Sequence, residues 1–196
     1  MTIRISKPAF NLREKITQLE GRVPFERMPV GSMMLIGRNA SSNRTNISSN
    51  QSWTNIVGAD IEVHPRLASS LLEIHMNFTM ESEAGPNGIG FRIYRQLKYM
   101  SNLAGPAVKI YDNYQHSHWS ASTPNWTGPG TIILEVYDNP YSAVADVDGS
   151  VTTDVTTKGT SVYYYAQGYK EVGNNFYVNY GQDAEGLLVT VKEIRQ

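Results

Sequence analysis

Residues 70–80 of the 196-residue chain read SLLEIHMNFTM, and this stretch decides the fold class. Apolar side chains occupy every second position from Leu72 to Met80, and polar side chains occupy the positions between them. Successive side chains of a strand point to opposite faces of its sheet. The alternation therefore predicts a β-strand with one buried face and one wet face.

The same period of two recurs along most of the chain after Met33. Inward-facing apolar sets are predicted at Ile61 and Val63; Ile89, Phe91 and Ile93; Ile132, Leu134 and Val136; Val162, Tyr164 and Ala166; Phe176, Val178 and Tyr180; and Leu187, Val189 and Val191. Clusters of Gly, Pro, Asn and Asp separate these sets at residues 85–88, 139–140, 148–149, 158–159 and 173–175. Eight or nine short strands with no helix between them predict a mainly β, antiparallel two-sheet sandwich of jelly-roll type.

One short helix is predicted near the N-terminus, over residues 12–20. Asn11 can cap this helix, Glu14 stands in the capping-box position, and Gly21 follows as a stop. Its narrow apolar stripe, with the residue before the cap, comprises Phe10, Leu12, Ile16 and Leu19. A helix this short is not stable alone in water, so it must dock. The stripe suits docking on its own β domain and docking on another subunit equally well.

The chain divides at a stiff connector over residues 22–32, which contains Pro24, Pro29 and Gly31. We therefore expect an N-terminal anchor over residues 1–32 and a jelly-roll-like β domain over residues 33–196. The anchor lies outside the region of period two, so we expect the β domain to fold without it. Total length is enough for one such core and too short for two full domains.

Composition narrows the function classes. The net charge is −1 and no strongly basic segment is present, so we expect no nucleic-acid contact. The chain has no cysteine, which excludes disulfides and thiol catalysis and favours synthesis in a reducing cytoplasm. The N-terminal residues do not resemble a signal peptide, and no apolar run is long enough to enter a membrane.

Two stretches depart from the period of two. Residues 39–55 are rich in Asn, Ser and Thr, and are compatible with a polar edge strand or a loop. Residues 97–130 are predicted as a long insertion rich in aromatic side chains. Its candidate contact residues are Tyr111, Tyr114, His116, His118, Trp119 and Trp126. These rings can either cover one end of the core as a lid or form a recognition surface, for example for a glycan.

Catalytic and metal-binding patterns are weak. The two imidazoles of His116 and His118 have only Asp112 nearby to complete a metal site. Asp146 and Asp148 begin like a calcium loop, but Thr157 stands where the closing glutamate belongs. There is no Gly-x-Ser-x-Gly elbow. We expect no catalytic residues, no metal site and no cofactor, and hence not an enzyme.

A family resemblance adds to this interpretation. Residues 29–36 (PVGSMMLI), the polar tract after them, residues 52–58 (SWTNIVG), 59–65 (ADIEVHP) and 69–74 (SSLLEI) resemble a β module of tail-fibre and other virion proteins of marine and cyanobacterial tailed phages. The segment NLREKITQL at 11–19 is similar to the short N-terminal segment of small virion proteins of that group. The resemblance covers roughly residues 8–96 and includes no catalytic motif. The sequence departs from the pattern at Ser70 and Leu71, where the family more usually has a lysine.

The resemblance implies a virion structural protein at the particle surface, usually an oligomer and often a trimer. We expect a tail-fibre or knob-like component that contacts the host and is held to other virion proteins by its N-terminal segment. A capsid decoration or cement protein with no host ligand is the first alternative. A lectin-like carbohydrate-binding domain is a more distant one.

Overall fold

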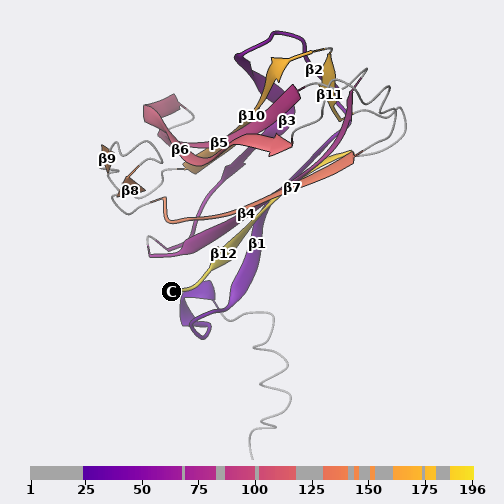
Figure 1. Cartoon of the computed structure of the whole chain (residues 1–196). Coiled ribbons are helices and arrows are strands. Elements are labelled where there is room, and N and C mark those ends of the chain that lie inside the picture. Colours follow the sequence, from indigo (N-terminus) through magenta and orange to yellow (C-terminus); the bar gives the residue numbers. More distant parts are fainter. Residues whose placement is uncertain are drawn as a thin grey trace, which may run out of the picture.

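The computed structural model describes residues 24–67, 69–82, 87–99, 102–117, 130–140, 144–145, 151–152, 161–173, 175–179 and 186–196. Within them the chain forms two stacked antiparallel sheets, a small ribbon and one short 3-10 turn, η1 (Phe25–Arg27) (Figure 1). The predicted N-terminal helix, with Phe10, Leu12, Ile16 and Leu19, lies outside the described residues.

The lower sheet in Figure 1 has the order β1–β12–β4–β7, and β2 and β11 extend it beyond the ends of β1 and β12. Its strands are β1 (Met33–Ser41), β2 (Thr45–Ile47), β4 (Leu71–Ser82), β7 (Gly130–Asp138), β11 (Phe176–Val178) and β12 (Leu187–Ile194). Its edges are β1 with β2 on one side and β7 on the other.

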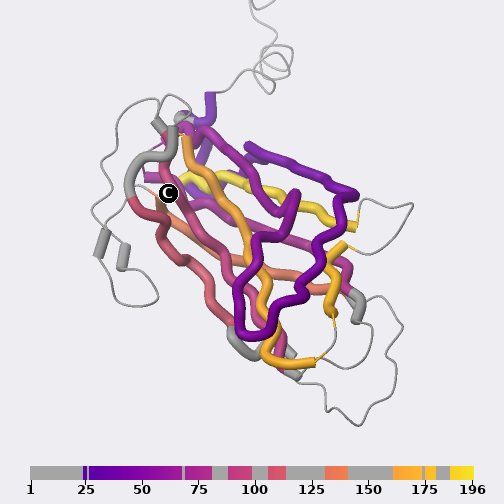
Figure 2. The backbone as a smooth tube through the Cα atoms, turned by 90° about the horizontal axis from the view of Figure 1, so that it is seen from above, coloured from indigo at the N-terminus to yellow at the C-terminus, as the bar shows by residue number. Residues whose placement is uncertain are grey.

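The upper sheet has the order β3–β10–β5–β6, and Figure 2 looks down onto it, with β10 in orange beside β5 in magenta. Its strands are β3 (Ser52–Val63), β5 (Asn87–Tyr99), β6 (Asn102–Ser117) and β10 (Ser161–Val172). The separate ribbon consists of β8 (Val144–Ala145) and β9 (Val151–Thr152).

The strand pairs are nested along the chain. The first strand pairs with the last (β1 with β12), β3 with β10, β4 with β7, and β5 with β6, all antiparallel. A long hairpin folded over on itself so that its strands alternate between two sheets has this pairing, which is the jelly-roll topology. The predicted mainly β, two-sheet sandwich is therefore confirmed, and the strand order makes it a jelly roll.

The predicted inward positions form the core between the sheets. All five alternating residues of β4 from Leu72 to Met80 are at most 3% exposed. The predicted inward residues of β5, β7, β10 and β12 are likewise buried and belong to one apolar cluster. Tyr180, predicted inward from the sequence, lies outside the described residues. The period of two thus located the core correctly because each sheet has one dry face.

Residues 97–130 are not one insertion, and this prediction was wrong. Residues 102–117 form β6, an edge strand of the jelly roll itself. The pairing of β6 with β5 shifts register at three places, including one between Ile93 and Tyr94. The shift between Ile93 and Tyr94 adds one residue on β6 and so changes which side chains face the core, while the other two shifts each add two residues and interrupt the pairing. The sequence of this strand therefore has no regular alternation. The polar tract 39–55 is strand for most of its length, as the end of β1, β2 and the start of β3.

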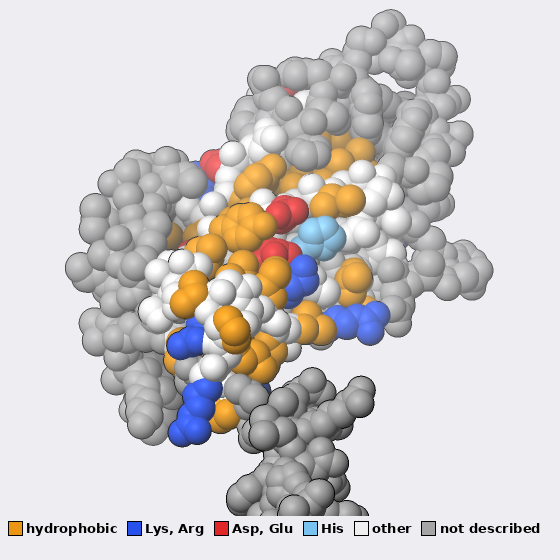
Figure 3. Space-filling model, turned by 90° about the horizontal axis from the view of Figure 1, so that it is seen from below, with side chains coloured by type: hydrophobic (Ala, Val, Ile, Leu, Met, Phe, Trp, Pro, Cys, Tyr) orange, Lys and Arg blue, Asp and Glu red, His pale blue; other side chains and the backbone are white. Residues whose placement is uncertain are grey.

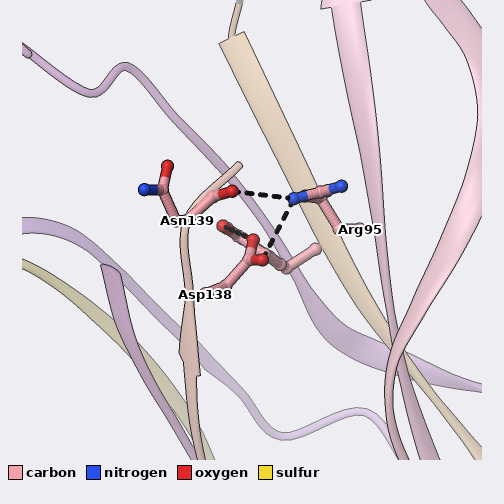
Figure 4. Close-up of polar contacts among 4 residues, drawn as sticks. Arg95, Asp138 and Asn139 are labelled. Carbon is pink, nitrogen blue, oxygen red and sulfur yellow. Dashed lines mark hydrogen bonds and ion pairs between the residues drawn. The ribbon is translucent and has the colours of Figure 1, made fainter. Parts of the chain in front are cut away.

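A buried polar cluster closes one end of the sandwich between β5, β7 and β10. Arg95 Nη1 lies 3.0 Å from Asp138 Oδ1 and 3.3 Å from the carbonyl oxygen of Asn139 (Figure 4). The hydroxyl of Tyr164 donates to Asp138 Oδ2 at 2.7 Å. The side chains of Arg95 and Asp138 are 1% and 2% exposed. Since a buried charge without a partner is costly, these contacts fix how the three strands meet.

Candidate functional site

A bulge in β3 opens the outer face of the upper sheet. Tyr165 of β10 pairs with Asp60 of β3, but two residues further Gln167 pairs with Asn55, so residues 56–59 lie opposite the single residue Ala166. Gly58 sits in the bulge with φ +82°, a conformation that side chains with a Cβ rarely adopt. Bulges of this kind are common next to binding sites because they redirect a strand locally.

The bulge is held from the lower sheet. Asn39 Nδ2 of β1 donates to the carbonyl oxygens of Gly58 (3.1 Å) and Asp60 (2.7 Å). The backbone N–H of Val57 donates to Thr45 Oγ1 at 2.8 Å. These bonds join backbone groups in and beside the bulge of β3 to side chains of β1 and β2, so the bulge is a fixed feature of this edge of the upper sheet.

Between the bowed strand and β10 lies an open hollow of about 440 Å³, within the roughly 300–1,000 Å³ of small-molecule sites. This β3 hollow is lined by residues 55–58 and Asp60 of β3, by Tyr163 and residues 165–167 of β10, and by Gln96 of β5.

Tyrosine rings form one wall of the β3 hollow. Tyr165 and Tyr94 stack with centroids 5.2 Å apart and an interplanar angle of 13°. Tyr163 and Tyr165 follow each other on the same face of β10, with centroids 5.7 Å apart. Tyr165 therefore contacts Tyr94 of β5 on one side and lines the hollow beside β3.

Carboxylate and amide groups complete the lining. The Tyr163 hydroxyl donates to Asp60 Oδ2 at 3.0 Å, and Gln167 Nε2 donates to Asn55 Oδ1 at 2.8 Å. Burial of the Tyr163 ring, followed by the charge and hydrogen bond of Asp60, raises the pKa of Tyr163 to about 12. Tyr163 is therefore a neutral hydrogen-bonding phenol at physiological pH and not a proton-transfer group.

Charged side chains beside the β3 hollow are paired with one another. Lys98 Nζ lies 2.6 Å from Glu62 Oε2 and 4.5 Å from the centre of the Tyr163 ring. Ser161 Oγ donates a short hydrogen bond to the same carboxylate. The hydrogen bonds from Lys98 and Ser161 hold the pKa of Glu62 below its ordinary value of 4.5. This arrangement stabilises one rim of the hollow without adding net positive charge.

The outer face of the lower sheet is the second candidate surface. Four of its side chains are half or more exposed although apolar or aromatic: Met33 (50%), Leu35 (55%), Ile133 (56%) and Tyr137 (54%). Figure 3 shows this face, with apolar side chains around a small group of acidic, basic and histidine side chains. Exposed apolar side chains gathered on one face are typical of protein–protein contact surfaces.

The two edges of this face differ in charge. The β1 edge carries Arg38 next to the apolar pair Met33 and Leu35, and the β7 edge carries Glu135 between Ile133 and Tyr137. The Tyr137 hydroxyl donates to Glu135 Oε1 at 2.9 Å, and this bond with the glutamate charge raises the pKa of Tyr137.

The central strands show the same order of charge, basic on the side of β1 and acidic on the side of β7. Lys192 is on β12, beside β1, and its Nζ lies 2.5 Å from Glu73 Oε1 on β4, beside β7. The face is therefore basic toward β1 and acidic toward β7.

Three of the predicted recognition residues, Tyr111, Tyr114 and His116, belong to β6, the edge of the upper sheet opposite the β3 hollow. Tyr111 on β6 is partly buried and packs against the core cluster. Tyr114 and His116 belong to β6 by their backbone. The side chains of Tyr114 and His116, and all of His118, Trp119 and Trp126, lie outside the described residues. The choice between a lid and a contact surface therefore stays open for these residues.

Sequence reasoning missed the β3 hollow although one sign was present. With Val162, Tyr164 and Ala166 inward, the same alternation places Tyr163 and Tyr165 outward as an aromatic pair. Asn55 and Asp60 carried no such sign, because only the bulge brings both of them beside that pair.

Within the part of the chain that the structure describes, no three His, Asp or Glu side chains are grouped closely enough to hold a metal ion. Among the same residues, no helix has the length and apolar character needed to cross a bilayer.

No protein-family model matches the chain, and no curated protein was found to match it. Among solved structures it is similar to those titled as infectious bursal disease virus, Gx strain (TM-score 0.38, 10% identity) and Gt strain (TM-score 0.39, 9% identity). The matches cover 89% and 84% of this chain but 41% and 37% of the viral chains, so the chain spans about two fifths of their length. TM-scores this low do not establish a shared fold, and no conclusion about this chain follows from them. The jelly-roll topology is established by the pairing of the chain's own strands.

Proposed function

We propose that this chain is a structural component of a viral particle, exposed at its surface and assembled as a closed homo-oligomer through the two edges of its lower sheet. The observation that carries the proposal is the complementarity of those edges. The β1 edge carries exposed apolar side chains with a basic one, and the β7 edge carries exposed apolar and aromatic side chains with an acidic one (Met33, Leu35 and Arg38 against Ile133, Glu135 and Tyr137).

Contact between unlike edges of identical chains is head-to-tail and forms a ring when the rotation closes. Apolar pairs such as Leu35 with Ile133 supply the burial, and Arg38 with Glu135 supplies the orientation. We take the closed ring to be a trimer, the state that the family resemblance implies.

Two further points support a role in a particle. The jelly roll is an architecture that virus capsid and lectin domains use, although a fold alone does not determine function. The sequence resemblance over residues 8–96 is to virion β modules of tailed phages. It favours a tail-fibre or knob-like component, attached to other virion proteins by residues 1–32, over a capsid decoration.

Assembly is tested by light scattering of the purified full chain. We expect a mass three times the 21.9 kDa of one chain, and dissociation when Ile133 is replaced by Glu, because the new charge would be placed against Leu35 of the neighbouring chain and the apolar contact would be lost. Val30→Glu is the matched control, since Val30 is 73% exposed in a turn outside both edges. A monomeric parent chain, or equal dissociation in both variants, would contradict the assembly proposal.

Location in the particle is tested by immunogold labelling of whole virions. Label at the tail tip or fibres is the expected result. Label spread over the capsid would instead favour the decoration protein, and particles without label would contradict the virion proposal.

A further inference from the structure

The β3 hollow combines an aromatic platform with neutral hydrogen-bonding groups. Tyr165 stacks on Tyr94 at a near-parallel 13° and contacts Tyr163, so these two rings hold the Tyr165 ring in place where it lines the hollow. A rigid ring of this kind costs little conformational entropy when a ligand packs on it.

Amides and one carboxylate surround that platform. The bond from Gln167 Nε2 to Asn55 Oδ1 uses one donor and one acceptor, and each amide has a second polar atom, Gln167 Oε1 and Asn55 Nδ2. Asp60 accepts the Tyr163 hydroxyl through Oδ2, and its Oδ1 takes no part in that bond. The hollow that Tyr165 lines therefore contains both hydrogen-bond donors and acceptors.

This chemistry matches one ligand class. A pyranose sugar has an apolar C–H face that packs on an aromatic ring and equatorial hydroxyls that both donate and accept. An anionic sugar is disfavoured because Asp60 lines the hollow and Glu62 lies beside it, while the neighbouring cations are paired, Lys98 with Glu62 and Arg92 with Asp112. A quaternary ammonium ion would suit the tyrosines and Asp60, but it has no hydrogen-bonding group for Gln167 Oε1 or Asn55 Nδ2.

We propose that the β3 hollow is a binding site for a neutral pyranose, with Tyr165 as the stacking platform and Asn55, Gln167 and Asp60 as hydroxyl partners. The site lies on the upper sheet, away from the lower-sheet edges. The inference goes beyond the assembly role and does not depend on it. An open hollow and a ligand of few atoms give an affinity on the order of 1 mM per site, which an oligomer would raise through several simultaneous contacts.

The test is saturation-transfer difference NMR on the full chain, with the methyl glycosides of glucose, galactose, mannose and N-acetylglucosamine, and with choline chloride as the cationic probe. We expect transfer to the ring C–H protons of at least one glycoside. Tyr165→Ala should abolish this transfer, and Asn55→Ala should weaken binding about tenfold, the effect of losing one well-placed hydrogen bond to a ligand.

Asn46→Ala is the matched control, because Asn46 is an exposed asparagine on β2, an edge strand of the other sheet. It should bind as the parent chain does. Melting curves identify any variant that fails to fold. If Tyr165→Ala is unfolded, Asn55→Ala decides, since Asn55 is exposed on an edge strand.

Three outcomes overturn the proposal: no transfer to any of the glycosides, transfer to choline alone, or unchanged glycoside binding in folded Tyr165→Ala and Asn55→Ala. None of these outcomes bears on the oligomeric mass, so the assembly proposal is tested separately.

Discussion

At the scale of single residues, the buried contact between Arg95 and Asp138 concentrates a large solvation cost on a few atoms. The two side chains are 3.0 Å apart and almost fully buried, and Tyr164 adds a second donor to the same carboxylate. Burying both charges costs solvation free energy that only close pairing recovers. The pair therefore specifies how β5 and β7 meet more than it adds net stability.

Removing one partner of this pair is expected to be more harmful than removing both. Arg95→Met should lower the free energy of unfolding by about 3–5 kcal/mol, because Asp138 would stay buried with its charge uncompensated. Tyr164→Phe, which removes one hydrogen bond, should cost about 1–2 kcal/mol. Urea unfolding of these variants and of Arg95→Met/Asp138→Leu is the measurement. A double variant that is less stable than Arg95→Met alone would contradict this account.

Glu62 gives the stability a defined pH dependence. Its pKa is lowered in the folded chain by hydrogen bonds from Lys98 and Ser161, so the ionised form favours folding. The contribution is fully present above the ordinary value of 4.5 and is lost as the pH falls through the lower folded-state value.

Thermal melts of the parent chain and Glu62→Gln, recorded at pH 7 and at several values below 4.5, measure this contribution. We expect the parent chain to melt higher at pH 7 and the difference to shrink as the solution is acidified. A difference that stays constant down to the lowest pH would show that the charge of Glu62 is not responsible.

At the scale of elements, the β3 bulge depends on glycine for two separate reasons. Gly58 has φ +82°, and a Cβ there would also lie 2.5 Å from Ser41 Cβ of β1. Gly31 has nearly the same backbone, with φ +86°, but nothing lies within 4 Å of a Cβ at that position. Replacing Gly31 by alanine therefore introduces backbone strain alone, while replacing Gly58 by alanine introduces both backbone strain and steric overlap.

Gly31→Ala should cost about 1 kcal/mol, the strain of a left-handed backbone alone. Gly58→Ala should cost about 2–4 kcal/mol, because the strain and the overlap with Ser41 add. Chemical denaturation measures both values. The double variant Gly58→Ala/Ser41→Gly should recover only the part of the free-energy cost that comes from the overlap with Ser41. Equal costs for the two alanine variants would mean that the close approach of β1 and β3 is not rigid.

At the scale of the whole molecule, the connector contributes to the β domain. Phe25 is fully buried, and the backbone of Gly31 and Ser32 pairs with Arg195 just beyond β12. The domain boundary at residue 32 stays a prediction, but Phe25, Gly31 and Ser32 before it also contact the β domain.

Two truncated chains test how much of the N-terminal segment the fold needs. A chain that starts at Pro24 keeps Phe25 and should melt cooperatively at the temperature of the full chain. A chain that starts at Gly31 should still fold, but about 10 °C lower, since losing a buried Phe costs about 3–5 kcal/mol. Circular dichroism melts give both values. An unfolded Pro24 chain would mean that residues 1–23 belong to the core and are not a separate anchor.

The sequence by itself determined the fold class and most of the core. Strands such as β4 and β12 have one dry and one wet face, so their alternation at Leu72 to Met80 and at Leu187 to Val191 follows directly from the geometry of a strand. The sequence predicted a two-sheet sandwich for the same reason.

Only the tertiary structure decided the strand order, the role of β6 and the position of the β3 hollow. Pairing of β1 with β12, or of Arg95 with Asp138, joins residues far apart in the chain, and local alternation does not specify such partners. Register shifts hid β6, since the one-residue shift between Ile93 and Tyr94 reverses the faces of the residues that follow and the two-residue shifts interrupt the pairing on either side of it. The bulge that brings Asn55 and Asp60 beside Tyr163 and Tyr165 exists only where β3 meets β10, because a mismatch in register is a property of two strands together.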